Sequence, residues 1–282
     1  MNCKAYDYNN ASESEINRLR IQAEVMKSFD IPVYRQLLSS ATSPVVLDIG
    51  CNNGDYAMSR LKDVGYSFYL GVDRSSPAIE TARGHYADDS TVFICADLSE
   101  AGFEKMIYNT LSYCGGFADI IIVSMVLLHL ADPTDLLKKL RGLLREGGTI
   151  IVKDIDDRDN CSSSDPNGIF AHAYEIACRN MGSGNRHAGR NVPMWLEKAG
   201  YSSITLRKKG LSTDGMDPAS REALFTTYFG VFEEDCQAQI NIDPSAAKDL
   251  LWCRENLPHI KECILREDFR FSLGFCFYTA TR

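Results

Sequence analysis

The sequence predicts an α/β fold in which helices cover both faces of a doubly wound, mostly parallel sheet of seven strands. Short β-rich and helical segments alternate through the first two thirds of the 282 residues. The run Ile120-Ile121-Ile122-Val123 is apolar without a break, which is typical of a strand buried on both faces of a parallel sheet. Gly50 and Gly54 follow the first β-rich segment, where such a strand turns into a helix.

Seven segments carry the β-branched and aromatic residues that favour strands, namely 44–50, 66–72, 91–96, 118–124, 149–152, 204–208 and 271–281. The first five are each followed by a helical segment or a loop, which implies parallel strands with right-handed crossovers. The helix after the fourth strand is expected to begin at Asp132 with a capping box and to stop at Gly147-Gly148.

The order of elements divides the chain into four parts. Residues 1–40 form an N-terminal helical cap with one amphipathic helix from Ser14 to Phe29, and residues 41–210 form the main domain. Residues 211–268 form a helical insertion, and residues 269–282 supply the last strand of the sheet. The stretch 211–269 holds twelve Asp and Glu against five Lys and Arg, and we expect this acidic insertion to be a lid or a homodimer contact.

Composition narrows the class of partner and compartment. The net charge is −8 and no long run of Lys or Arg occurs, so a nucleic-acid partner is not expected. The longest near-apolar run, 120–130, is too short to cross a bilayer, and residues 1–10 lack the apolar core of a signal peptide. The ten cysteines form no C-x-x-C pair, which favours reduced thiols and a cytoplasmic protein.

Polar residues recur at the ends of four successive predicted strands. Asp48, Asp73, Asp97 and Ser124 are separated by 25, 24 and 27 residues, about one strand–helix unit each. Because ligands of open α/β sheets bind at the carboxyl ends of the strands, these residues are expected to converge on one crevice. Asp73 lies 23 residues after Gly50, near the offset of an acid that accepts hydrogen bonds from ribose hydroxyls.

These residues carry a family resemblance. Val46-Leu-Asp-Ile-Gly-Cys-Asn-Asn-Gly54, Gly71-Val-Asp-Arg74, Cys95-Ala-Asp-Leu98 and Ser124-Met-Val-Leu-Leu-His129 resemble the successive motifs of class I S-adenosylmethionine-dependent methyltransferases. The resemblance covers roughly residues 44–155 and implies a Rossmann-like fold. It departs from the family at Asn52, where glycine is common, although Asn tolerates the left-handed backbone.

The resemblance implies S-adenosylmethionine as cofactor and a role for each matching residue. The backbone of the loop Gly50, Cys51, Asn52 and Gly54 would cradle the methionine moiety and ribose, and Asp48 would support the loop or the ammonium group. Asp73 would hold the ribose hydroxyls and Arg74 would flank the adenine.

The remaining motifs complete this implied cofactor site. Asp97 would accept from the adenine amino group while the Leu98 amide donates to the ring, and the Ser124 carbonyl would lie near the ammonium. No metal is expected.

The leading hypothesis is methyl transfer to a small-molecule acceptor. His129 follows the fourth strand at the mouth of the expected site, and it would be a base that titrates near neutral pH or a residue that only braces the loop. A nicotinamide-dependent oxidoreductase ranks low, because its dinucleotide-binding motif requires glycine at the positions that Asn52 and Asp55 occupy. Two further hypotheses are a nucleic-acid methyltransferase and a non-catalytic module that binds the cofactor.

Three further groups of residues each allow two interpretations. The segment that contains Arg18 and Gln22, preceded by Tyr6 and Tyr8, would close over the cofactor or form a solvated helix face. A basic group would bind an acidic substrate or lie in a surface loop, and it consists of Arg186, His187 and Arg190. An acidic group would bind a metal or form a polar loop, and it consists of Asp154, Asp156 and Asp157.

Overall fold

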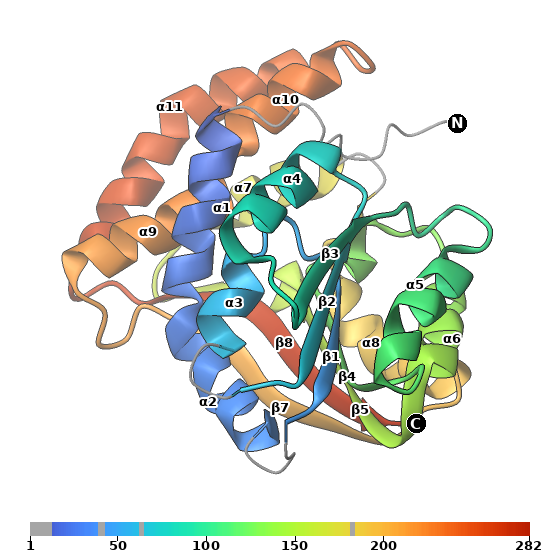
Figure 1. The fold of residues 1–282 in the computed structure, drawn as a ribbon. Coiled ribbons are helices and arrows are strands. Elements are labelled where there is room, and N and C mark those ends of the chain that lie inside the picture. Colours follow the sequence, from blue (N-terminus) through green and yellow to red (C-terminus); the bar gives the residue numbers. More distant parts are fainter. Residues whose placement is uncertain (1–12, 39–42, 62–64, 181–183) are drawn as a thin grey trace.

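The computed structural model describes residues 13–38, 43–61, 65–180 and 184–282. Its centre is a twisted sheet whose long strands follow the order β3-β2-β1-β4-β5-β8, with β7 paired to the outer side of β8 (Figure 1). The strands are β1 Val45–Ile49, β2 Phe68–Asp73, β3 Thr91–Cys95, β4 Ala118–Ser124, β5 Leu144–Ile155, β7 Ser202–Ser212 and β8 Phe271–Thr281. The first five are parallel, and β8 is antiparallel to β5 and to β7.

This architecture confirms the predicted fold class. The seven long strands are those expected from the sequence, and an eighth of two residues, β6 Cys161–Ser162, extends the sheet where a loop was expected. The prediction that the helix before β5 stops at Gly147-Gly148 is wrong. Helix α6 Pro133–Leu143 ends earlier, because the chain from Leu144 already pairs with Ala118 of β4.

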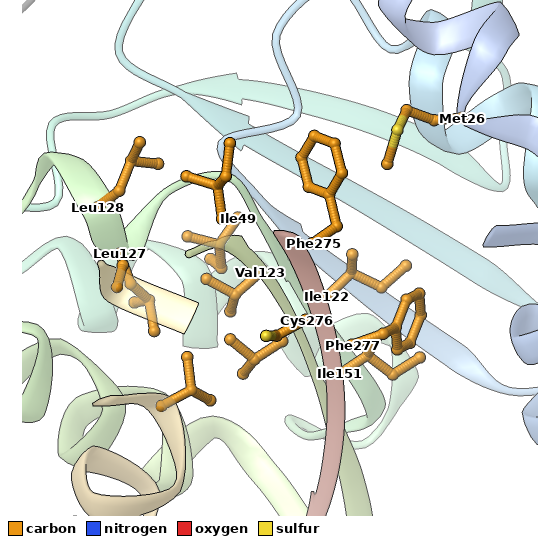
Figure 2. Packing of buried hydrophobic residues seen from close by; sticks show 14 of the residues in the cluster. Met26, Ile49, Ile122, Val123, Leu127, Leu128, Ile151, Phe275, Cys276 and Phe277 are labelled. Atoms are coloured by element: carbon orange, nitrogen blue, oxygen red, sulfur yellow. The ribbon is translucent and has the colours of Figure 1, made fainter. Parts of the chain in front are cut away.

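Helices cover both faces of the sheet (Figure 1). The helices α2 Lys27–Leu38, α3 Asp55–Leu61 and α4 Ser76–Tyr86 lie on one face, and α5 Phe103–Leu111, α6 and α8 Ala188–Lys198 lie on the other. Figure 2 shows the apolar centre, where Ile122 and Val123 of β4 lie near Ile151 of β5 and Phe275 and Phe277 of β8. All five side chains are buried, as the unbroken apolar run predicted.

A second group of helices stands at the carboxyl ends of the strands. It comprises α7 Ile169–Asn180 and the three helices between β7 and β8, which are α9 Pro218–Phe229, α10 Phe232–Ile240 and α11 Ala246–Leu265. The predicted single helix Ser14–Phe29 is instead two, α1 Glu13–Val25 and α2, with a turn at Met26. The break lets α2 pack on α3 while α1 packs on α9 of the insertion.

Candidate functional site

The carboxyl ends of β1, β2, β3 and β4 meet around one cavity of about 550 Å³. A cavity of this size suits a cofactor or drug-sized ligand. Ten of the eleven residues predicted for the site line it, namely Asp48, Gly50, Cys51, Asn52, Asp73, Arg74, Asp97, Leu98, Ser124 and His129. Gly54 is not among the lining residues.

The loop after β1 owes its shape to three left-handed residues. Gly50, Asn52 and Gly54 have φ angles of 74°, 49° and 82°, so Asn52 does adopt the conformation for which glycine is common. The Gly50 and Cys51 amides both donate to the carbonyl of Val72 in β2. A Cβ atom on Gly50 would lie 2.4 Å from Cγ2 of Val126, so only glycine lets the loops after β1 and β4 approach this closely.

Gly54 therefore shapes the loop from outside the cavity. Its amide donates to the carbonyl of Cys51, which closes the turn that begins α3. A Cβ atom there would meet the rings of Tyr86 and Phe93 at 3.1–3.2 Å.

Two carboxylates are fixed by local backbone bonds at the wall of the cavity. Asp73 accepts from the amides of Asn52 and Ser75, each at 2.9 Å, one bond on each carboxylate oxygen. Asp97 accepts on Oδ1 from the amide of Ser99 at 2.8 Å and from its hydroxyl at 2.7 Å. These two bonds, followed by the charge of Arg74, lower the pKa of Asp97, so it is an anion at neutral pH.

Asp48 is a buried carboxyl at the floor of the cavity. It is 3% exposed and accepts from the hydroxyl of Tyr69 at 2.7 Å. Burial raises its pKa to about 7, against the lowering effect of the Tyr69 bond, because an ionised carboxylate loses its hydration there. Asp48 is therefore poised between its two protonation states at neutral pH.

His129 lines the cavity at the end of the 3₁₀ helix η3 Leu127–His129. Burial, followed by the charges of Arg74 and Arg186, lowers its pKa to about 4. Of the two interpretations of His129, the one in which it titrates near neutral pH is therefore wrong, because the sequence shows neither the burial of the ring nor the two arginines near it. The imidazole is therefore neutral at pH 7.

Helix α1 and the end of β5 add residues that sequence reasoning did not assign to the cavity wall. Ile16, Leu19 and Ala23 of α1 line it together with the expected Gln22, whereas Arg18 does not. Tyr56 of α3 and Lys153 of β5 also line it. The one available signal was Lys153 itself, a lysine inside an otherwise apolar buried strand.

Arg18 faces the insertion. Its guanidinium donates to the backbone carbonyl of Thr227 in α9 at 3.0 Å and pairs with Glu15. Tyr6 and Tyr8 lie outside the described residues.

The basic and acidic groups after β5 neutralise one another. Arg186 pairs with Asp157, and Arg190 pairs with Asp156. His187 lies 3.5 Å from Asp156. Within the described ranges, no group of three or more His, Cys, Asp and Glu side chains is arranged to hold a metal ion. None of the described helices has the length and apolar character needed to span a membrane.

Comparison with known proteins identifies the family. Residues 31–208 match the family described as methyltransferase domain. A tRNA U34 carboxymethyltransferase of Colwellia psychrerythraea is 26% identical over 192 residues, 67% of this chain and 54% of that protein. An uncharacterized methyltransferase of Schizosaccharomyces pombe is 24% identical over 163 residues, 55% of this chain and 56% of that protein. The chain thus spans about half the length of the curated relatives it matches.

Solved structures share the fold. The YcgJ protein of Bacillus subtilis superposes with a TM-score of 0.56 at 11% identity, covering 90% of this chain and 98% of its own. Phosphoethanolamine N-methyltransferase 2 of Haemonchus contortus, solved with S-adenosylhomocysteine, superposes with a TM-score of 0.53 at 15% identity, covering 94% and 58%. With the family match over more than half of the sequence, the chain belongs to the methyltransferase domain family, and its predicted membership of the class I S-adenosylmethionine-dependent methyltransferases is confirmed.

Proposed function

We propose that this enzyme binds S-adenosylmethionine in the cavity at the strand ends and transfers its methyl group to a small molecule. The observation that carries the proposal is the convergence of Asp73, Asp97 and the left-handed loop at Gly50 on one cavity of about 550 Å³. Hydrogen bonds from backbone amides hold both carboxylates and the loop, and each bond lies within one strand–loop unit or joins two successive units. The shape of the site therefore follows from the fold itself.

Asp73 and Asp97 would fix the nucleoside. A carboxylate offers about four lone-pair positions, and the two backbone bonds to Asp73 leave room for two ribose hydroxyls. On Asp97 only Oδ1 is engaged by the residues that the structure describes, so Oδ2 would accept from the adenine amino group. The Leu98 amide and Arg74 would bound the base on either side.

The loop after β1 and the end of β4 would hold the amino-acid part of the cofactor. The backbone of Gly50, Cys51 and Asn52 would contact it, and Gly54 would set the turn. Asp48 in its ionised form and the carbonyl of Ser124 would face the ammonium group. A bound ammonium would favour the Asp48 anion and draw its pKa below 7.

The sulfonium supplies an activated methyl group, so the residues of this chain need only align the acceptor and exclude water. Alignment of this kind is worth roughly 7–11 kcal/mol. Ile16 and Leu19 of α1 would close the cavity over the acceptor. His129, neutral at pH 7, would accept the proton that the acceptor loses.

We further propose that the acidic insertion acts as a lid. Helix α9 packs on α1, which lines the cavity, and the bond from Arg18 to Thr227 ties these two helices together. The negative charge of the insertion, −7 over residues 211–269, disfavours a polyanionic acceptor there. The opposing consideration is the likeness to tRNA-modifying relatives, which keeps a nucleic-acid acceptor as the second candidate.

Release of S-adenosylhomocysteine tests the proposal. The purified protein is incubated with S-adenosylmethionine and either a low-molecular-weight metabolite fraction or bulk tRNA, with Asp73→Ala as the inactive control. We expect S-adenosylhomocysteine to be released with the metabolite fraction and not with tRNA. Release with tRNA alone would contradict the small-molecule acceptor, and binding without any release would indicate a non-catalytic module.

A further inference from the structure

A cluster of buried charged groups lies beside the cavity at the end of β5. Asp30 of α2, Arg60 of α3 and Lys153 of β5 are 0%, 2% and 1% exposed. Tyr56 of α3 stands among them, its hydroxyl donating to Asp30 and accepting from Lys153. The methyl-transfer chemistry described above uses none of these four residues.

Among these four residues there is one more positive charge than negative charge, and the neighbouring carboxyls of Asp48 and Asp154, whose pKa values burial raises to about 7, are only partly ionised at neutral pH. Asp30 is already paired with Arg60, whose Nη2 lies 3.0 Å from Oδ2. Lys153 is a second cation on the same carboxylate, with its Nζ 3.3 Å and 3.4 Å from the two oxygens. Burial strips the Lys153 ammonium of its hydration and, together with the charge of Arg60, lowers the pKa of Lys153 to about 8, against the raising effect of Asp30.

The excess charge is directed to one end of the cavity. Lys153 and Tyr56 line it, and Lys153 lies opposite Ser124 in the pairing of β4 with β5. Of the other cations in the lining, Arg74 follows β2 at the opposite end and Arg20 lies on α1. An ammonium group has three N–H donors, and the described partners of Lys153, Asp30 and Tyr56, occupy two.

We propose that Lys153, supported by Tyr56, forms a carboxylate-binding subsite at the β5 end of the cavity. The inference rests on the proposed function, because it assigns the ligand's acidic group to that same cavity. A bound carboxylate would balance the excess charge of the cluster and fill the third donor of Lys153. The carboxylate belongs either to the amino-acid part of the cofactor or to an acidic acceptor.

Calorimetric titration of the full chain separates the two sources. The first pair of probes is S-adenosylhomocysteine and its decarboxylated analogue, which differ only in the carboxylate. The second probe is benzoate, titrated into the complex with S-adenosylhomocysteine. The variants are Lys153→Met, which leaves Asp30 paired with Arg60, and Lys139→Met, a control at a partly exposed position of α6 that does not line the cavity.

If the subsite holds the carboxylate of the cofactor, the wild type prefers S-adenosylhomocysteine by about 10–100-fold, and Lys153→Met alone removes that preference. If it holds the acceptor, that preference is absent, and benzoate binds the wild-type complex but not the complex of Lys153→Met. The proposal is overturned by the wild-type protein itself if it prefers S-adenosylhomocysteine over the decarboxylated analogue by less than twofold and also binds no benzoate. It is also overturned by a Lys153→Met protein that keeps the wild-type response.

Tyr56→Phe carries the test if Lys153→Met does not fold. Loss of the hydroxyl partner of Lys153 is expected to reduce the wild-type response at least threefold, and an unchanged response overturns the proposal. Failure of the proposed function is distinct, because a wild type without the site would bind neither adenosyl probe.

Discussion

The cavity has two walls that are built in different ways. The strand wall is formed by the loops after β1, β2, β3 and β4, and the cap wall is formed by α1 together with Tyr56 and Lys153. On the strand wall, bonds join residues of the same strand–loop unit or of the next one, as from Ser75 to Asp73, two residues apart, and from Asn52 to Asp73, 21 residues apart. On the cap wall, Lys153 meets Asp30 across 123 residues, and helix α1 is held from behind by the bond from Arg18 to Thr227 across 209 residues. The strand wall would therefore hold a ligand through preformed local geometry, whereas the cap wall depends on how distant segments pack.

Loss of a strand-wall carboxylate tests this difference most strongly. Asp73→Ala is expected to weaken S-adenosylhomocysteine binding more than 100-fold, because two hydrogen bonds to a charged group are lost. The ligand-induced rise in melting temperature would largely disappear. Asp88→Ala is the control, since Asp88 likewise accepts two local hydrogen bonds, from the amide and the hydroxyl of Ser90, but lies outside the cavity. Equal losses in both variants would contradict the assignment.

Removal of the imidazole tests the chemical step. His129→Ala is expected to lower kcat about 100-fold and leave the affinity for S-adenosylhomocysteine within threefold, because the proton acceptor is lost while the nucleoside contacts remain. Steady-state kinetics and calorimetry measure the two quantities. A fall in kcat of less than about threefold would remove His129 from the mechanism.

Addition of a methyl group at the loop tests the close approach of the loops after β1 and β4. Gly50→Ala is expected to cost about 2–4 kcal/mol of unfolding free energy, from left-handed strain and overpacking against Val126. Gly65→Ala, at φ 75° with nothing within 4 Å, is expected to cost about 1 kcal/mol from strain alone. Urea unfolding measures both.

Val126→Ala added to Gly50→Ala should recover part of this stability, because it removes the atom 2.4 Å from the new Cβ. No recovery would show that the contact does not limit the loop.

Neutralisation of Asp48 tests the buried carboxyl. Because its pKa is raised from 3.8 to about 7, the folded state binds a proton that the unfolded state has lost, and stability falls as pH rises through this window. Asp48→Asn removes that titration and keeps an acceptor for Tyr69, so its stability relative to wild type should rise by about 1–3 kcal/mol between pH 5 and pH 8. Asp154, whose pKa is also raised to about 7, is present in both proteins and cancels.

Thermal unfolding across this pH range measures the difference. The same variant should bind S-adenosylhomocysteine more weakly if Asp48 faces the ammonium group. A stability difference that does not change with pH would show that Asp48 does not titrate in this window.

The smallest effect is expected on the cap wall. Arg18→Met breaks the bond from α1 to Thr227 of α9 and should cost about 1 kcal/mol of stability and a few-fold in ligand affinity. Lys27→Met removes only an exposed pair with Glu24 and should change neither. Loss of affinity in Lys27→Met as well would indicate a general effect of charge, and the specific link between the cap and the insertion would then be refuted.

The sequence alone determined the strand wall and most of the fold. Apolar runs and glycine turns are local signals, so the seven long strands, the loop at Gly50 and the positions of Asp73 and Asp97 followed from residue type and spacing. The break at Met26, the early end of α6 and the lowered pKa of His129 did not, because each depends on a segment distant in sequence.

Only the tertiary structure placed Lys153 beside Asp30 and α1 against the insertion. A lysine in a buried strand shows that a partner must exist, since a lone buried charge is too costly, but not which one. The partner is chosen by the packing of helices over the sheet, which is a property of the whole chain.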